Sequence, residues 1–184
     1  MEREEAWTLL KKHLKNRNLL KHSIACEVIM QFLARQWGEN EKEWALAGLL
    51  HDIDYEETNG ELTEHGRLGA EILKEAGLPE EIIRTVQAHN PEATGIKPES
   101  LMEKALYAVD PVSGFIVACA LIHPEKKLDS LDLSFLLHRF SEKSFARGAN
   151  REAMKSIEST GLSLEEFLKI ALSAMQTKKE ELGL

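Results

Sequence analysis

The sequence contains little of what would define several other classes of protein. Its two cysteines, Cys26 and Cys119, are too few for a disulfide framework and too far apart for a CxxC metal motif. The longest uninterrupted apolar run, residues 115–122, is too short to span a bilayer, and the N-terminal segment lacks the apolar stretch of a signal peptide. Basic residues are outnumbered, because 23 Lys and Arg stand against 31 Asp and Glu for a net charge of −8.

These absences narrow the range of functions. A net charge of −8 argues against a protein that binds long nucleic acids, but it leaves room for a small phosphorylated ligand held by a local basic cluster. We expect no membrane partner and a cytoplasmic location. The length of 184 residues, with 43% hydrophobic and 29% charged residues, predicts a single globular domain over residues 1–184.

Apolar residues recur at helical spacing along most of the chain, and no segment alternates as a strand would. The pattern therefore predicts an all-α fold, a single compact helical bundle. Helices are expected over 3–15, 19–37, 41–54, 64–76, 80–90, 99–122, 131–146, 151–159 and 164–178. We expect loops at 55–63, 91–97 and 123–130, and Pro111 should kink or break its helix.

Five of the predicted helices each carry a histidine or an aspartate on an apolar face. These residues are His22, the adjacent pair His51 and Asp52, His65, His89 and Asp110. One such histidine is more often a hydrogen-bonded core residue than a ligand. Burying the whole set without partners would cost several kcal/mol per ionised group, and a cation at their meeting point would offset that cost. A set of His and Asp without Cys favours Fe, Mn, Co, Ni or Zn.

The order of these residues resembles that of the HD-domain superfamily, whose members are all-helical metal-dependent phosphohydrolases. The name-giving doublet stands in AGLLHDIDYE at 47–56, and the later histidines stand in EHGRLGAEIL and VQAHN. The resemblance covers roughly residues 19–122 and extends to the six-ligand order of the two-metal subset. Within that subset the order is similar to HD-type bis(5′-nucleosyl)-tetraphosphatases, from which the sequence departs after the doublet, at IDYEETNG. The GYP signature of cyclic dinucleotide phosphodiesterases is absent.

The resemblance implies one or two divalent transition metal ions. It implies a first ion bound by His22, His51, Asp52 and Asp110, and a second ion bound by Asp52, His65 and His89. Two such ions bind a phosphate oxygen and lower the pKa of a bridging water, and the resulting hydroxide attacks phosphorus. The expected activity is hydrolysis of a phosphomonoester or phosphodiester, with a small nucleotide as the substrate. HD-type core residues 19–122 would carry this site.

Four more residues are candidates for the site. Asp54 is predicted to be catalytic, either by orienting a ligand histidine or by moving a proton, and the alternative is a solvated loop acid. Arg67, Lys143 and Arg147 are candidates for binding substrate phosphate, and the alternative for each is surface solubility. Residues 131–178 carry no motif. They are expected to pack on the core, and roles as a wall of the substrate pocket or as a homodimer surface stay open.

Two other functions stay open at this point. Some proteins with the same ligand order are mixed-valent di-iron oxygenases, which need redox-active iron, whereas a hydrolase works with several divalent ions. The third class is a non-catalytic domain that binds a metal or a nucleotide. A purely structural metal site should unfold on chelation, whereas a catalytic site should lose turnover first.

Overall fold

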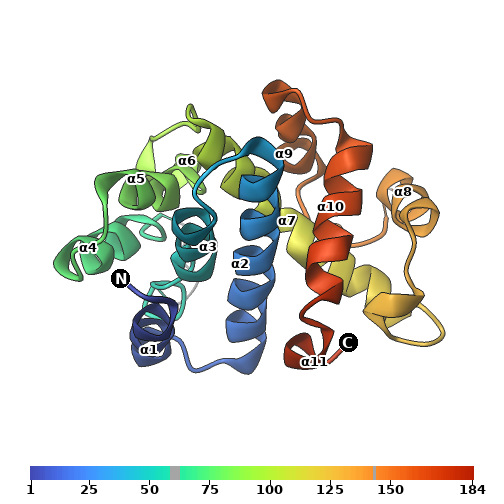
Figure 1. The fold of residues 1–184 in the computed structure, drawn as a ribbon, viewed down its shortest axis with the longest axis horizontal. Helices are drawn as coiled ribbons and strands as arrows, with labels where there is room; N and C mark the ends of the chain where they lie inside the picture. Colours follow the sequence, from blue (N-terminus) through green and yellow to red (C-terminus); the bar gives the residue numbers. More distant parts are fainter. Residues whose placement is uncertain (59–62, 143) are drawn as a thin grey trace.

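A computed structural model describes residues 1–58, 63–142 and 144–184 (Figure 1). Every regular element in these residues is a helix, so the predicted all-α class is confirmed. The α-helices are α1 Arg3–His13, α2 Arg17–Trp37, α3 Glu41–Leu50, α4 Arg67–Glu75, α5 Glu80–Ala88, α6 Pro91–Thr94, α7 Leu101–Ile122, α8 Leu133–Ser141, α9 Arg151–Lys155, α10 Leu164–Gln176 and α11 Lys179–Leu182. Two 3₁₀ turns, η1 Leu128–Ser130 and η2 Ser156–Thr160, complete the described elements.

Several helix ends differ from the prediction. The helix expected over 41–54 ends at Leu50, and the chain continues through turns that carry the His51–Asp52 doublet. The helix expected from residue 64 begins at Arg67, because Gly66 has a φ of +90° and cannot continue a right-handed helix. The loop expected at 91–97 contains the short helix α6, and the loop expected at 123–130 contains η1.

Of the kink or break expected at Pro111, the break is wrong, because α7 runs without interruption from Leu101 to Ile122. Pro111 has no N–H to donate to the carbonyl of Tyr107, and its ring crowds that carbonyl. Together these two effects cost a helix about 3 kcal/mol. Its neighbours Val109 and Val112 are fully buried. Packing of α7 against α2 and α9 outweighs that cost.

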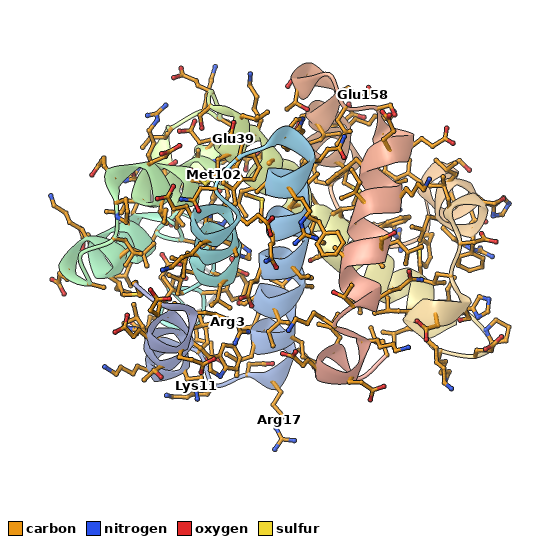
Figure 2. The ribbon with its side chains drawn as sticks, in the orientation of Figure 1. Arg3, Lys11, Arg17, Glu39, Met102 and Glu158 are labelled. Carbon is orange, nitrogen blue, oxygen red and sulfur yellow. The ribbon has the colours of Figure 1, made fainter. Side chains whose placement is uncertain are left out.

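Helix α7 is long and apolar enough to span a membrane, the one such helix among the described residues. Of its most apolar 18-residue window, 56% is buried within the protein, which is the pattern of a core helix. In Figure 1, α2 stands between α3 and α10, and α7 crosses behind them. Figure 2 shows Lys11, Arg17 and Glu158 projecting from the periphery, as their exposure requires.

The closest helix pair, α2 and α3, depends on a glycine. A Cβ atom at Gly48 would lie 2.6 Å from the carbonyl oxygen of Cys26, so only glycine allows this approach. The contact is on the side of α2 that carries His22, one turn before Cys26. Close packing of these two helices therefore brings the end of α3, and with it His51, next to His22.

Candidate metal centre

The six predicted ligands, contributed by five segments of the chain, lie together. His22 comes from α2, His51 and Asp52 follow α3, His65 precedes α4, His89 caps α5, and Asp110 lies in α7. All of them except His51 line one groove of about 460 Å³. His51 is fully buried beneath it. The segments meet because α3, α5 and α7 all pack against one another and α2 packs against α3 and α7.

The Nε2 atoms of the four histidines converge. The Nε2 atoms of His22 and His51 are 3.1 Å apart, and those of His65 and His89 are 2.9 Å apart. Asp52 lies between the two pairs: its Oδ1 is 3.2 Å from Nε2 of His65, and its Oδ2 is 3.3 Å from Nε2 of His22. Asp110 Oδ1 lies 3.2 Å from Nε2 of His22 on the open side. Two carboxylates and four ring nitrogens therefore share one small volume.

The other nitrogen of each ring is anchored outside this volume. His51 Nδ1 lies 2.8 Å from the carbonyl oxygen of Gly48, and His89 Nδ1 contacts the carbonyl oxygen of Val86. His65 Nδ1 lies 2.7 Å from Asp54 Oδ1.

His22 Nδ1 is anchored by a hydroxyl. It lies 2.8 Å from Ser113 Oγ, whose own proton is donated to the carbonyl of Asp110. A neutral imidazole that donates its Nδ1–H presents an Nε2 lone pair, so these four partners orient every ring to bind a metal once its Nε2 proton has been displaced.

The donor set fits divalent metal. Two groups of side chains could each hold an ion: His22 with His51 and Cys26, and Asp52 with His65 and His89, the ligand atoms of each group lying within 4.8 Å of one another. Cys26 Sγ is 3.9 Å from both nitrogens of the His22 ring. The sulfur therefore lies alongside this ring and away from the point where the histidine Nε2 atoms converge. Imidazole and carboxylate donors favour borderline or hard divalent ions.

The charges of the cluster determine how it behaves without metal. Burial lowers the pKa of His51, but the charges of Asp52 and Cys26 and the hydrogen bond with Asp110 outweigh burial and raise that pKa to about 9. Burial likewise lowers the pKa of His65, and the carboxylates of Asp52 and Asp54 raise it to about 10. The pKa of Asp52 is held well below its usual range by the facing imidazoles, despite burial. A metal ion must therefore displace protons from the histidines.

Asp54 is placed to position His65. It is fully buried, it does not line the groove, and it accepts hydrogen bonds from the backbone N–H groups of Gly66 and Gly69 at 2.8 and 2.6 Å. These bonds and the one with His65 lower the pKa of Asp54 against the effect of burial. This placement favours the orienting role over direct proton transfer to a substrate, because the Asp54 carboxylate reaches the groove only through His65. The catalytic role of Asp54 stays a prediction.

Neither Arg67 nor Arg147, two of the three predicted phosphate-binding residues, lines the groove itself. The guanidinium of Arg67 donates to the carbonyl of Ala93, with Nε at 2.8 Å, and thereby ties α4 to α6. Arg147 is exposed and precedes Gly148, which lines the groove. Lys143 lies outside the described residues. All three roles stay predictions.

The sequence reasoning missed two contributors to the site. Ser113, the anchor of His22, lies three residues after Asp110, and that spacing on a helix could have identified it. Tyr55 packs edge-on to His65 with ring centroids 5.3 Å apart and lines the groove. The C-terminal part contributes as well, since Gly148 forms part of the wall.

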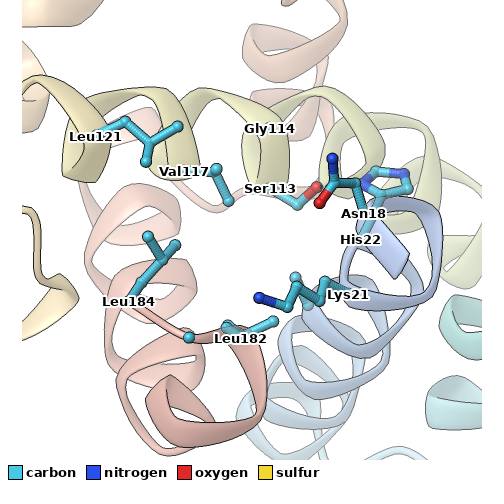
Figure 3. Close-up of a pocket in the computed structure, with 11 residues that line it drawn as sticks. Asn18, Lys21, His22, Ser113, Gly114, Val117, Leu121, Leu182 and Leu184 are labelled. Atoms are coloured by element: carbon cyan, nitrogen blue, oxygen red, sulfur yellow. Dashed lines mark hydrogen bonds between the residues drawn. The ribbon is translucent and has the colours of Figure 1, made fainter. Parts of the chain in front are cut away.

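A second cavity, of about 430 Å³, lies behind His22 and Ser113 (Figure 3). Lys21 of α2, Leu121 of α7 and Leu182 of α11 line it. His22 thus borders both this cavity and the metal groove.

The helical fold and the His–Asp cluster define a class, the metal-dependent hydrolases of the HD superfamily. The profile of the HD domain matches residues 19–120, more than half of the sequence. The chain therefore belongs to the HD-domain family.

Curated relatives share the name Ribonuclease Y. The protein of Thermotoga petrophila is 27% identical over 165 residues, which cover 90% of this chain and 32% of the relative. That of Thermosipho melanesiensis is 33% identical over 138 residues, or 73% of this chain and 26% of the relative. The chain thus spans about a quarter to a third of the length of these relatives. No solved structure matches the chain.

Proposed function

We propose that the chain hydrolyses a phosphate ester of a small nucleotide, a phosphomonoester or phosphodiester, with one or two divalent transition metal ions. The supporting observation is the convergence of four Nε2 atoms and two carboxylates, with every Nδ1 atom anchored on the outside. Lone pairs facing one another at about 3 Å repel unless a proton or a cation lies between them. The cluster is thus suited to hold ions at the floor of an open groove.

In this proposal His22, His51, Asp52 and Asp110 hold one ion, and Asp52, His65 and His89 hold the other. A bound divalent metal lowers the pKa of water and polarises a phosphoryl oxygen. The residues of the chain orient the ligand histidines and leave one side of the site open to the substrate.

Asp54 keeps His65 in the tautomer with its lone pair inward, and Ser113 does the same for His22. Asp110, whose side chain is 39% exposed, is the ligand nearest to solvent, so a substrate phosphate approaches from its side.

RNA is the second candidate substrate, because the relatives named above are ribonucleases. A net charge of −8 disfavours a long polyanion, which is why we place a small nucleotide first. None of the named relatives is a tetraphosphatase, so dinucleoside tetraphosphate is one substrate to include in a panel. Their name also supports hydrolysis over the di-iron oxygenase that the ligand order left open. A cytoplasmic location and a homodimer belong to the same proposal.

The test is a substrate panel with metal-reconstituted protein. Nucleoside monophosphates, dinucleoside polyphosphates, p-nitrophenyl esters and a short RNA are offered with Mn, Fe, Co, Ni or Zn. We expect turnover of small nucleotides, and we expect Asp52→Ala to lose both turnover and bound metal, since Asp52 faces both groups of ligands.

His138→Ala is the control, because His138 is exposed and pairs only with Glu142 among the described residues. Retained turnover in Asp52→Ala refutes the two-ion proposal. RNA cleavage without small-nucleotide turnover moves the substrate to RNA. Bound iron without turnover of any phosphate ester moves the function to the oxygenase.

A further inference from the structure

The metal groove continues into a second hollow. This hollow, of about 250 Å³, shares His89, Asn90, Asp110 and Gly148 with the metal groove. It extends away from the metal ligands along α7 to Tyr107 and across to Asn150. A phosphate at the metal centre therefore has a compartment beside it for the rest of the molecule.

The lining of the hollow is suited to a neutral nucleoside. The Tyr107 side chain is half-buried and makes no hydrogen bond or ring contact with any other described residue, so its ring is available for stacking. Asn150 uses its side-chain oxygen to accept from the N–H groups of Glu152 and Ala153, and its NH₂ group donates to none of the described residues. Aromatic rings and amides are what proteins use to bind single bases.

The charges lining the hollow disfavour a second phosphate. Glu92 and Asp110 are both among the lining residues, and none of the described lining residues is Lys or Arg. Asp110 is a metal ligand in the proposed site, so the free carboxylate of this hollow is that of Glu92. It repels a second phosphate in such a space, whereas the hydroxyls of a ribose can donate to it. A polyphosphate tail or a nucleic-acid backbone therefore fits this hollow worse than one nucleoside does.

The wall that contains Gly148 is held by an arginine. Arg151 donates to the carbonyl oxygens of Phe145 at 2.7 Å and Ala149 at 2.9 Å, and also to that of Ala146. Its guanidinium lies 4.7 Å from the centroid of the Phe115 ring. Ala146 has a φ of +43°, a conformation that a residue with a Cβ adopts only when its surroundings impose it. Arg151 imposes it, and so fixes Gly148 between the two hollows.

We propose that this hollow, the nucleoside subsite lined by Tyr107, Asn150, Gly148 and Glu92, binds the nucleoside next to the reactive phosphate. Tyr107 stacks on the base, and Arg151 is a positioning residue that keeps the wall in place. The inference rests on the proposed function, since it assigns the nucleoside side of that substrate. The reactive ester is then a 5′- or 3′-nucleoside phosphate.

Binding of nucleosides tests the subsite without requiring turnover. The full chain is titrated by NMR with adenosine, guanosine, cytidine, uridine and ribose, with and without Zn²⁺. We expect the nucleosides to bind at least about tenfold more tightly than ribose, because base stacking contributes about that factor or more. Tyr107→Leu should remove this preference, and Tyr107→Phe should retain it.

Two arginine variants test the wall. Arg151→Met should weaken nucleoside binding and raise KM for nucleoside monophosphates more than it lowers kcat, while ribose binding changes little. Arg139→Met is the matched control, because Arg139 also lies over a phenylalanine, Phe135, but bonds only Glu142 among the described residues. It should leave nucleoside binding unchanged.

The outcomes separate the subsite from the proposed function. Equal binding of nucleosides and ribose, no saturable binding of any nucleoside, or an unaffected Tyr107→Leu variant overturns the subsite. If nucleoside monophosphates are still hydrolysed in that case, the proposed function stands. Conversely, Tyr107-dependent nucleoside binding without hydrolysis of any phosphate ester supports the subsite and refutes the hydrolase proposal.

Discussion

Replacement of Asp54 by asparagine should weaken metal binding although Asp54 is not a ligand. Asp54 Oδ1 receives the His65 Nδ1 proton, and Oδ2 receives the N–H groups of Gly66 and Gly69. Asparagine has the same shape but only one acceptor oxygen. If that oxygen serves the two N–H groups, the NH₂ group faces His65 Nδ1, and the ring proton moves to Nε2. The lone pair that should face the metal is then lost.

The opposite orientation of the amide is no better. The NH₂ group would then face two backbone donors that are buried with it, leaving both without an acceptor. Hydrogen bonds to a charged group contribute about 1.5–3 kcal/mol each, so we expect the Asp54→Asn protein to lose about 2–4 kcal/mol of stability. Disrupting the partner that orients a metal-binding histidine lowers metal affinity about 10- to 100-fold.

Chelator competition gives the metal affinity, and thermal unfolding with and without metal gives the stability. Asp132→Asn is the control, because Asp132 caps α8 by accepting from Phe135 N at 2.7 Å, and asparagine caps a helix about equally well. Asp132→Asn should change neither quantity. Wild-type metal affinity in Asp54→Asn would refute the reasoning that Asp54 sets the tautomer of His65.

Four further predictions concern packing, proton release, the pH dependence of stability and the His22 anchor. Gly48→Ala should lower stability by about 1–3 kcal/mol and weaken metal binding, because the added Cβ would collide with the Cys26 carbonyl. Thermal unfolding and chelator competition measure the two effects, and an unchanged Tm would contradict this prediction. Because the pKa of His22 is raised well above its usual range and the pKa values of His51 and His65 are raised to about 9 and 10, metal binding at pH 7.5 should release at least two protons. Calorimetry in buffers of different ionisation enthalpy measures this number. The raised pKa values also mean that protonated His51 and His65 stabilise the folded, metal-free protein. This contribution is fully present below about pH 6.5 and is lost as the pH rises through 9–10, so a Tm that rises over that range would be contrary evidence. Ser113→Ala should reduce metal affinity about tenfold while Ser130→Ala, at an exposed turn, should not.

The six predicted ligands could be found from the sequence because each lies in line with the apolar face of a helix that local spacing predicts. His65 lies in a turn and His51 ends a helix, yet both keep the spacing of the apolar face beside them. The anchors of the rings were harder to predict. Gly48 and Val86 hold His51 and His89 through backbone carbonyls, which any residue type could supply.

Tertiary packing explains the remaining differences. The continuity of α7 through Pro111 depends on α2 and α9, which are distant in sequence. The wall beside the groove depends on Arg151, a residue whose three backbone contacts follow no sequence pattern. The nucleoside subsite likewise joins Tyr107 and Asn150 across 43 positions of the sequence, and only the fold places them at one hollow.

The most direct test of the account is the metal content of protein purified without added metal, measured by elemental analysis together with turnover of phosphate esters. The account predicts about two equivalents of transition metal per chain, phosphate-ester hydrolysis, and the loss of both in Asp52→Ala. Protein that hydrolyses phosphate esters equally well after complete removal of metal, or Asp52→Ala protein that retains its full metal content, would contradict it.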